Sequence, residues 1–140
     1  MASMLEQLME LPLFRGASIS RMSKIVGESK FHFFKYPAGE TVLSVGDKCA
    51  HVTFILNGKV RTTIENNNGR FAVSQTLVAP TIIRPDFLFG KVTSYPFSAQ
   101  AIDSVSILQI SKSDFIRILD SDHVFLFNFL NMLSVDAQKG

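Results

Sequence analysis

The side chains most often used in catalysis or metal binding are few in this chain and lie far apart in its sequence. The three histidines, His32, His51 and His123, do not fall at the spacing of a zinc-binding helix or of a serine–histidine–aspartate triad. The single cysteine, Cys49, excludes an internal disulfide and a cysteine-rich zinc site. We therefore expect no enzymatic activity, no metal and no bound cofactor, and we interpret each histidine as a structural or surface residue.

Charge and hydropathy narrow the class of protein further. The 140 residues suit one domain, and 46% of them are hydrophobic, which is enough for one core. The net charge is only +2, so the chain lacks the concentrated basic face of a nucleic-acid-binding domain. The most apolar run, residues 124–133, is too short to span a bilayer, and the N-terminus lacks the pattern of a signal peptide. We expect a cytoplasmic protein with no membrane partner.

Hydrophobic patterning divides this single domain, residues 1–140, into three parts. Residues 1–29 show helical spacing: Pro12 ends a first helix, and Ser18 or Ser20 can cap a second. Residues 30–110 alternate short strand-like runs with turn signals, and residues 111–136 return to helical spacing. The pattern predicts a mainly β fold with flanking helices: an antiparallel, jelly-roll-like β-roll. Strands are expected at residues 31–36, 41–45, 51–56, 59–64, 71–78, 97–102 and 105–110.

Turn and cap signals indicate how some of these elements connect. Asn57-Gly58 separates two strand-like runs, and because both residue types accept positive φ the dipeptide predicts a β-hairpin. Residues 66–69, Asn-Asn-Asn-Gly, predict another turn. Ser111 and Asp114 form a variant of the capping box at the start of a helix. That helix is expected to carry the apolar residues Phe115, Ile116 and Leu119.

The final predicted helix is apolar around most of its circumference, with one polar stripe of Asn128, Asn131 and Ser134. Such a helix must be buried on two sides, and packing on the roll covers only one. We expect the second side to form a homodimer interface; a simple core helix is the alternative. The sequence does not decide which of two apolar stripes faces the partner. One stripe contains Phe125, Phe129 and Met132, and the other contains Leu126, Leu130 and Leu133.

The order in which several glycine-containing turn motifs occur along the sequence resembles that of a known family. The segments in question are Pro37-Ala38-Gly39-Glu40, Gly46-Asp47, Phe54-Ile55-Leu56-Asn57-Gly58-Lys59-Val60, Phe89-Gly90 and Ser113-Asp114-Phe115. Over about residues 5–135 the chain resembles the cyclic-nucleotide-binding-like sensor domain of bacterial Crp/Fnr-type transcription regulators. The resemblance implies a homodimer that detects a small-molecule effector. It also implies promoter binding through a C-terminal helix-turn-helix of roughly 60–70 further residues, which we expect in a longer parent protein.

The segment that holds the nucleotide in this family differs here. The resemblance implies a glutamate directly after Gly90 for the ribose hydroxyl and an arginine directly after Pro96 for the cyclic phosphate. This sequence has Lys91 and Phe97 at those places. Since phenylalanine cannot neutralise a phosphate, we expect an effector other than cyclic AMP or cyclic GMP. The candidate ligand-binding residues are Phe89, Gly90, Lys91, Tyr95, Phe97 and Ser98.

Several alternatives stay open at this stage. The pocket is either retuned to a more apolar or carboxylate-bearing small molecule, or filled by Phe97 so that the roll serves dimerisation alone. Arg84 or Arg70 is a possible substitute cation. The single cysteine excludes an iron–sulfur cluster, whereas haem sensing is left open. The alternative function is a stand-alone ligand-binding regulatory domain that is not linked to DNA binding.

Overall fold

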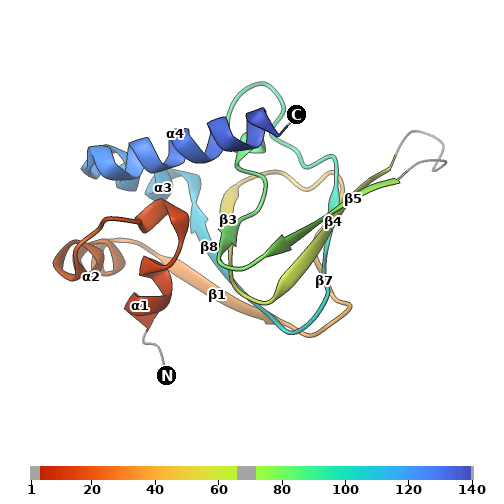
Figure 1. Cartoon of the computed structure of the whole chain (residues 1–140), viewed down its shortest axis with the longest axis horizontal. Helices are drawn as coiled ribbons and strands as arrows, with labels where there is room; N and C mark the ends of the chain where they lie inside the picture. The colour runs from red at the N-terminus through yellow and green to blue at the C-terminus, as the bar shows by residue number, and fades with distance from the viewer. Residues whose placement is uncertain (1–3, 66–71, 140) are drawn as a thin grey trace.

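The computed structural model describes residues 4–65 and 72–139 and places two four-stranded sheets beside a group of helices (Figure 1). The strands are β1 (Phe31–Tyr36), β2 (Thr41–Leu43), β3 (His51–Asn57), β4 (Lys59–Glu65), β5 (Ala72–Val78), β6 (Thr81–Ile82), β7 (Ser98–Ala101) and β8 (Val105–Ser111). One sheet has the order β1-β8-β3-β6 and the other the order β2-β7-β4-β5, with antiparallel pairing throughout. The mainly β fold and the antiparallel roll are confirmed.

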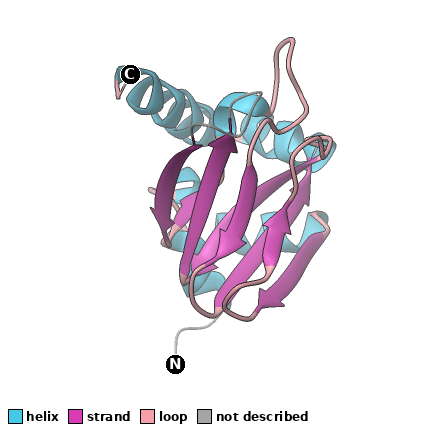
Figure 2. Cartoon of the chain, turned by 90° about the vertical axis from the view of Figure 1, so that its right-hand side faces the viewer, coloured by secondary structure: helices cyan, strands magenta, loops and turns pink. Residues whose placement is uncertain are grey.

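The α-helices lie at the two ends of the described chain, and one of the two 3-10 turns lies between β6 and β7. These elements are α1 (Met4–Met9), the 3-10 turn η1 (Pro12–Phe14), α2 (Ile19–Glu28), the 3-10 turn η2 (Pro85–Phe87), α3 (Lys112–Ser121) and α4 (His123–Gln138). The side chain of Ser18 caps α2 by accepting the N–H of Arg21, so Ser18 and not Ser20 is the cap. Helix α4 continues two residues beyond the expected end at residue 136 and lies across one end of the strands (Figure 2).

The predicted hairpin at Asn57-Gly58 is wrong. Strand β3 pairs with β6 and β8, whereas β4 pairs with β5 and β7, so the dipeptide turns the chain from one sheet into the other. Only Gly58 takes a positive φ, 93°, and a Cβ atom there would collide with the backbone oxygen of Ser104. Gly58 therefore allows the turn between β3 and β4 to pack closely against the turn between β7 and β8. The predicted turn at residues 66–69 lies outside the described residues.

Two other expectations are corrected in detail. The strand expected at residues 41–45 ends at Leu43, because the Asp47 carboxylate accepts the N–H of Ser44 at 2.9 Å and closes a turn. Of the three apolar residues expected on α3, Ile116 does not join the core but is exposed. The buried apolar residues of α3 are Phe115, Ile118 and Leu119.

Aromatic side chains join the helices to the roll. The ring of Phe14 in η1 lies 6.4 Å from the ring of Phe54 in β3 and 5.7 Å from that of Phe125 in α4, the second pair edge to face. All three side chains are buried. Asn128 of α4 also donates through its side-chain amide to the backbone oxygens of Leu13 and Arg15, at 2.9 Å each. This residue of the predicted polar stripe therefore holds α4 against η1.

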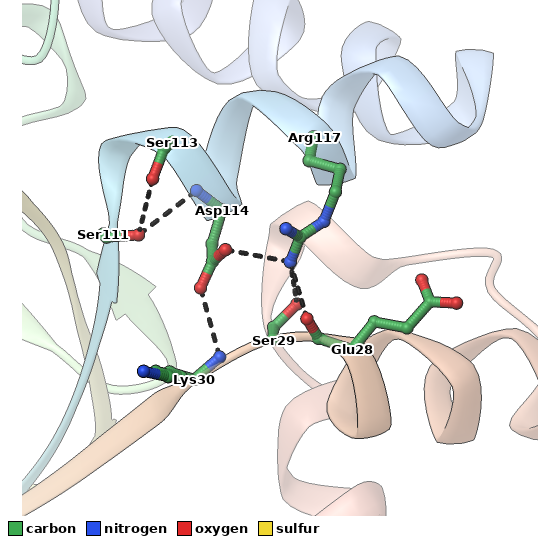
Figure 3. A network of polar contacts seen from close by, with 7 residues as sticks. All are labelled: Glu28, Ser29, Lys30, Ser111, Ser113, Asp114 and Arg117. Atoms are coloured by element: carbon green, nitrogen blue, oxygen red, sulfur yellow. Dashed lines mark hydrogen bonds and ion pairs between the residues drawn. The ribbon is translucent and has the colours of Figure 1, made fainter.

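A polar network anchors the start of β1 (Figure 3). The Ser111 hydroxyl accepts the N–H of Asp114 at 3.2 Å, which is the predicted cap of α3. The Asp114 carboxylate, however, accepts the backbone N–H of Lys30 at 3.1 Å and pairs with Arg117 at 2.9 Å. Arg117 in turn donates to the backbone oxygen of Glu28 at 2.8 Å. Asp114 thus fixes the α2–β1 junction instead of reaching back to its own helix cap as in a capping box.

Candidate functional site

The candidate ligand-binding residues lie in the segment that connects η2 to β7. Residues 91–97 form no helix; their backbone pairs instead with the turn that follows β2. The N–H of Tyr95 donates to the oxygen of Asp47 at 2.9 Å, and the N–H of Cys49 donates to the oxygen of Thr93 at 2.7 Å. The Tyr95 amide is therefore already used inside the chain and does not point at an anion from a helix N-terminus.

Two of the six candidates are buried. The Phe97 side chain has no exposed surface, and its ring lies 5.0 Å from that of Tyr95 and 6.0 Å from that of Phe87. The Tyr95 hydroxyl accepts a hydrogen bond from Cys49 Sγ at 2.9 Å. Burial first, and the Cys49 contact next, raise the pKa of Tyr95 well above its ordinary value, so its phenol stays neutral. Both aromatic side chains belong to the packed interior of the roll.

Three other candidates lie on the outside of the same segment. The Phe89 ring is part exposed and packs against the helices, 6.4 Å from the ring of Phe115 and 6.2 Å from that of Phe129. Gly90 and Lys91 are exposed, and Gly90 has a φ of 95°. The sixth candidate, Ser98, begins β7 and is half-buried. The structure thus brings Tyr95 and Phe97 into contact and places Phe89 against α3 and α4.

Positive charge reaches this region from Arg84 and from Lys112, whose Nζ lies 5.7 Å from the centre of the Phe89 ring. Of the two, Arg84 lies beside the buried ring of Phe97. Its guanidinium carbon lies 4.9 Å from the centre of the Phe87 ring and 5.5 Å from that of Phe97. Its Nε and Nη2 atoms donate to the two carboxylate oxygens of Asp86 at 3.0 and 2.7 Å. This bidentate pair raises the pKa of Arg84 and lowers that of Asp86, and Asp136 of α4 adds a second negative charge to the surroundings of Arg84.

The charge of Arg84 is therefore balanced within the chain. Sequence reasoning considered Arg84 but missed Asp86, although the spacing Arg-Pro-Asp was a local signal for such a pair. The other arginine considered, Arg70, lies outside the described residues. Lys91 is exposed and makes no ion pair within the described part of the chain.

Helix α4 presents its two apolar stripes differently. Phe125 and Phe129 are buried against the chain's own core, with Met132 half-buried beside them. The second stripe faces outward: Leu126 is 40% exposed and Leu130 is 52% exposed. Phe127, which sequence reasoning did not single out, is 69% exposed, although its place in the apolar run was the available signal. Leu133, the third residue of the second stripe, is half-buried and packs against the core. The structure thus assigns the Phe125 stripe to the core and leaves Leu126 and Leu130 of the other stripe exposed.

Among residues 4–65 and 72–139, no three histidine, cysteine, aspartate or glutamate side chains gather as a possible metal site. No helix there is long and apolar enough to cross a membrane.

The family model of the cyclic nucleotide-binding domain matches residues 33–122, which include most of β1, all of β2 to β8 and all of α3. This chain belongs to the cyclic nucleotide-binding domain family. The match begins inside β1 and ends at the residue before α4, so it contains the η2–β7 segment described above. No curated protein matches the sequence.

Solved structures of transcriptional regulators share the fold of this family member. A transcriptional regulator from Thermotoga maritima is 25% identical, with a TM-score of 0.71 over 84% of this chain and 89% of that chain. The sensor domain of the transcriptional regulator DNR from Pseudomonas aeruginosa is 16% identical, with a TM-score of 0.76 over 95% and 87%. The catabolite activator protein of Thermus thermophilus is 18% identical, with a TM-score of 0.77 over 91% of this chain but 59% of that chain.

Proposed function

We propose that this domain is the effector-sensing and dimerisation part of a Crp/Fnr-type transcription regulator, and that its effector is neither cyclic AMP nor cyclic GMP. The observation that carries the second half is the burial of Phe97, the residue at the place where the family resemblance implies an arginine. Promoter binding is assigned to a helix-turn-helix elsewhere in the parent protein, and the sensor domain is assigned to the cytoplasm.

Charge supports this assignment. A cyclic phosphate brings a full negative charge into a mostly enclosed site, where an unpaired charge costs several kcal/mol. Phe97 has no positive charge. The Nε and Nη2 groups of Arg84 already donate hydrogen bonds to the carboxylate of Asp86. Loss of one buried charge-assisted partner costs about 2–5 kcal/mol, or roughly thirty- to several-thousand-fold in affinity. A small apolar or carboxylate-bearing effector would meet a lower cost.

The outer face of α4 supports the homodimer. Leu126, Leu130 and Leu133 follow one another at spacings of four and three residues, which is the spacing of a coiled-coil seam. Leu126 and Leu130 are exposed in the single chain, and Phe127 lies beside them. A second copy of the same helix would cover these side chains with an identical apolar surface, as two-fold symmetric interfaces do.

Calorimetric titration of the purified chain with cyclic AMP and cyclic GMP at millimolar concentration tests the effector assignment. We expect no saturable binding in the micromolar range. The variant Lys91→Ala, with Lys24→Ala as the matched exposed control, should then behave like the wild type. Low-micromolar binding that Lys91→Ala abolishes and Lys24→Ala preserves would mean that Lys91 replaces the missing arginine, and the assignment would be wrong.

A further inference from the structure

Strand β1 is a long sheet edge that exposes aromatic side chains. Its full length pairs with β8 on one side, from Phe31 opposite Ile110 to Tyr36 opposite Val105. On its other side no strand pairs with it in the described part of the chain. Unpaired strand edges expose a row of backbone donors and acceptors, and proteins ordinarily protect them by shortness or by polar residues.

The other sheet edges have such protection along their length, whereas the centre of β1 does not. Strands β2 and β6 contain three and two residues. Strand β5 is longer, but the polar residues Ser74, Gln75 and Thr76 occupy its centre. In β1 the central residues are Phe33 and Phe34, which are 47% and 41% exposed. Because consecutive strand residues point to opposite faces, this edge is aromatic on both faces of the sheet.

A lysine lies on each side of these aromatic residues in the sequence. Lys30 immediately precedes β1 and Lys35 lies near its end, both exposed, and residues 30–36 contain no acidic side chain. Neither lysine ammonium forms an ion pair within the described part of the chain. The nearest acid in sequence, Glu28, directs its carboxylate away from the Lys30 side chain (Figure 3). The edge therefore has an apolar centre and a free cation at each end.

Hydrogen bonds from α3 also hold the start of β1 in place within the chain. The Asp114 carboxylate holds the backbone N–H of Lys30, and Arg117 holds the backbone oxygen of Glu28, so the chain enters β1 in a defined direction (Figure 3). A pre-ordered strand loses little conformational entropy when a second strand pairs with it.

We propose that β1 is a docking edge for an extended segment of another protein that is apolar at its centre and acidic at both ends. The segment would join the sheet β1-β8-β3-β6 as an added strand, through backbone hydrogen bonds along β1 and acidic side chains opposite Lys30 and Lys35. A second copy of this chain fits less well. Antiparallel pairing of β1 with itself would place Lys30 of one copy near Lys35 of the other at each end, with no acid in residues 30–36 to separate them. Like charges across strands are destabilising.

Fluorescence anisotropy with synthetic peptides tests this proposal on the full chain. The probe is the peptide Glu-Glu-Val-Phe-Val-Thr-Glu-Glu, with all glutamates replaced by lysine in one control and the central phenylalanine replaced by proline in another. We expect saturable binding of the acidic peptide only. Lys35→Glu should weaken it at least about tenfold, since a favourable charge pair becomes a repulsive one. Phe33→Ser should also weaken it, whereas Val73→Ser on the β5 edge should leave it unchanged.

Two measurements keep the outcome unambiguous. Circular dichroism should show that each variant keeps the fold, because the altered side chains are exposed. Amide NMR shifts on addition of the acidic peptide should be largest from His32 to Lys35. Equal binding of the acidic and lysine peptides, shifts away from β1, or no binding up to millimolar peptide would overturn the proposal. Self-association that Phe33→Ser abolishes, without peptide binding, would make a second copy the occupant and would overturn it as well.

Discussion

The η2–β7 segment and the outer face of α4 contrast in how their chemical groups are satisfied. In the η2–β7 segment, Phe97 and Tyr95 are buried, although Phe89 and Lys91 of the same segment are exposed. Just before η2, Arg84 pairs with Asp86. On the outer face of α4, Leu130 and Phe127 remain more than half exposed. The two buried rings and Arg84 thus have partners inside the described part of the chain, whereas the outer side chains of α4 do not.

This difference reverses the usual expectation for the family. In a nucleotide-binding member, the segment before β7 would present unpaired donors to a phosphate, and its cost in stability would be offset by the ligand. Here the same segment contributes the rings of Tyr95 and Phe97 to the core. On α4, Leu126, Phe127 and Leu130 are exposed, and neighbouring exposed apolar side chains commonly mark an interface with another protein. This contrast is the reason that we propose assembly through α4 and an effector other than a cyclic nucleotide.

The largest effect is expected from removing the buried aromatic ring of the η2–β7 segment. Phe97→Ala should lower the free energy of unfolding by about 3–5 kcal/mol, because the cavity left by a fully buried phenylalanine cannot fully collapse. Phe33→Ala is the matched control, since the same change at an exposed site should cost far less. Urea denaturation followed by circular dichroism measures both. A loss below about 1 kcal/mol for Phe97→Ala would show an adaptable interior and would break the contrast.

The next effect concerns the uncovered side of the contrast. Leu130→Glu should raise the dimer dissociation constant at least about tenfold, equivalent to about 1.4 kcal/mol, because it places an unpaired charge in the seam. The fold of each subunit should survive, since Leu130 is exposed in the single chain. Ile116→Glu on α3 is the control, because Ile116 is exposed to a similar degree but lies outside the proposed seam. Analytical ultracentrifugation of wild-type protein that remains monomeric at high concentration would remove the basis for this interface.

Local signals in the sequence were reliable where the structure depends on neighbouring residues. Ser18 and Ser111 cap helices through contacts three residues away; Ser111 was the predicted cap, and Ser18 was one of two candidates. The Asn57-Gly58 hairpin failed for the opposite reason. Whether β3 pairs with β4 depends on partners far away in the sequence, such as Leu108, which lies opposite Phe54. A dipeptide motif carries no information about such partners.

The candidate site shows the same division. The substitutions at Lys91 and Phe97 were visible by comparison with the family pattern, and so was the surplus of apolar residues on α4. Periodicity alone could not decide which α4 stripe is buried, because both stripes are apolar. That choice depends on where Phe14 and Phe115 lie after folding, next to Phe125 and Phe129 respectively.

The smallest effect is expected from the buried hydroxyl group of Tyr95. Tyr95→Phe removes the acceptor of the Cys49 hydrogen bond and should cost about 1 kcal/mol or less, because a thiol is a weak donor. The pH dependence is more informative. A folded-state pKa raised above its unfolded value of about 10 means that the folded chain keeps a proton that the unfolded chain releases. The stability linked to Tyr95 is therefore fully present below about pH 10 and is lost as the pH rises further.

In a Tyr36→Phe background Tyr95 is the only tyrosine, so tyrosinate absorbance reports on it alone. We expect that absorbance to appear only together with the loss of the circular dichroism signal, since the buried phenol cannot ionise while the roll is intact. Adding Tyr95→Phe should shift the alkaline unfolding midpoint to higher pH, because the group that drives proton release on unfolding is gone. Tyrosinate that forms near pH 10 while the fold persists would mean that water reaches Tyr95. The η2–β7 segment would then open readily, and the contrast with α4 would be one of degree.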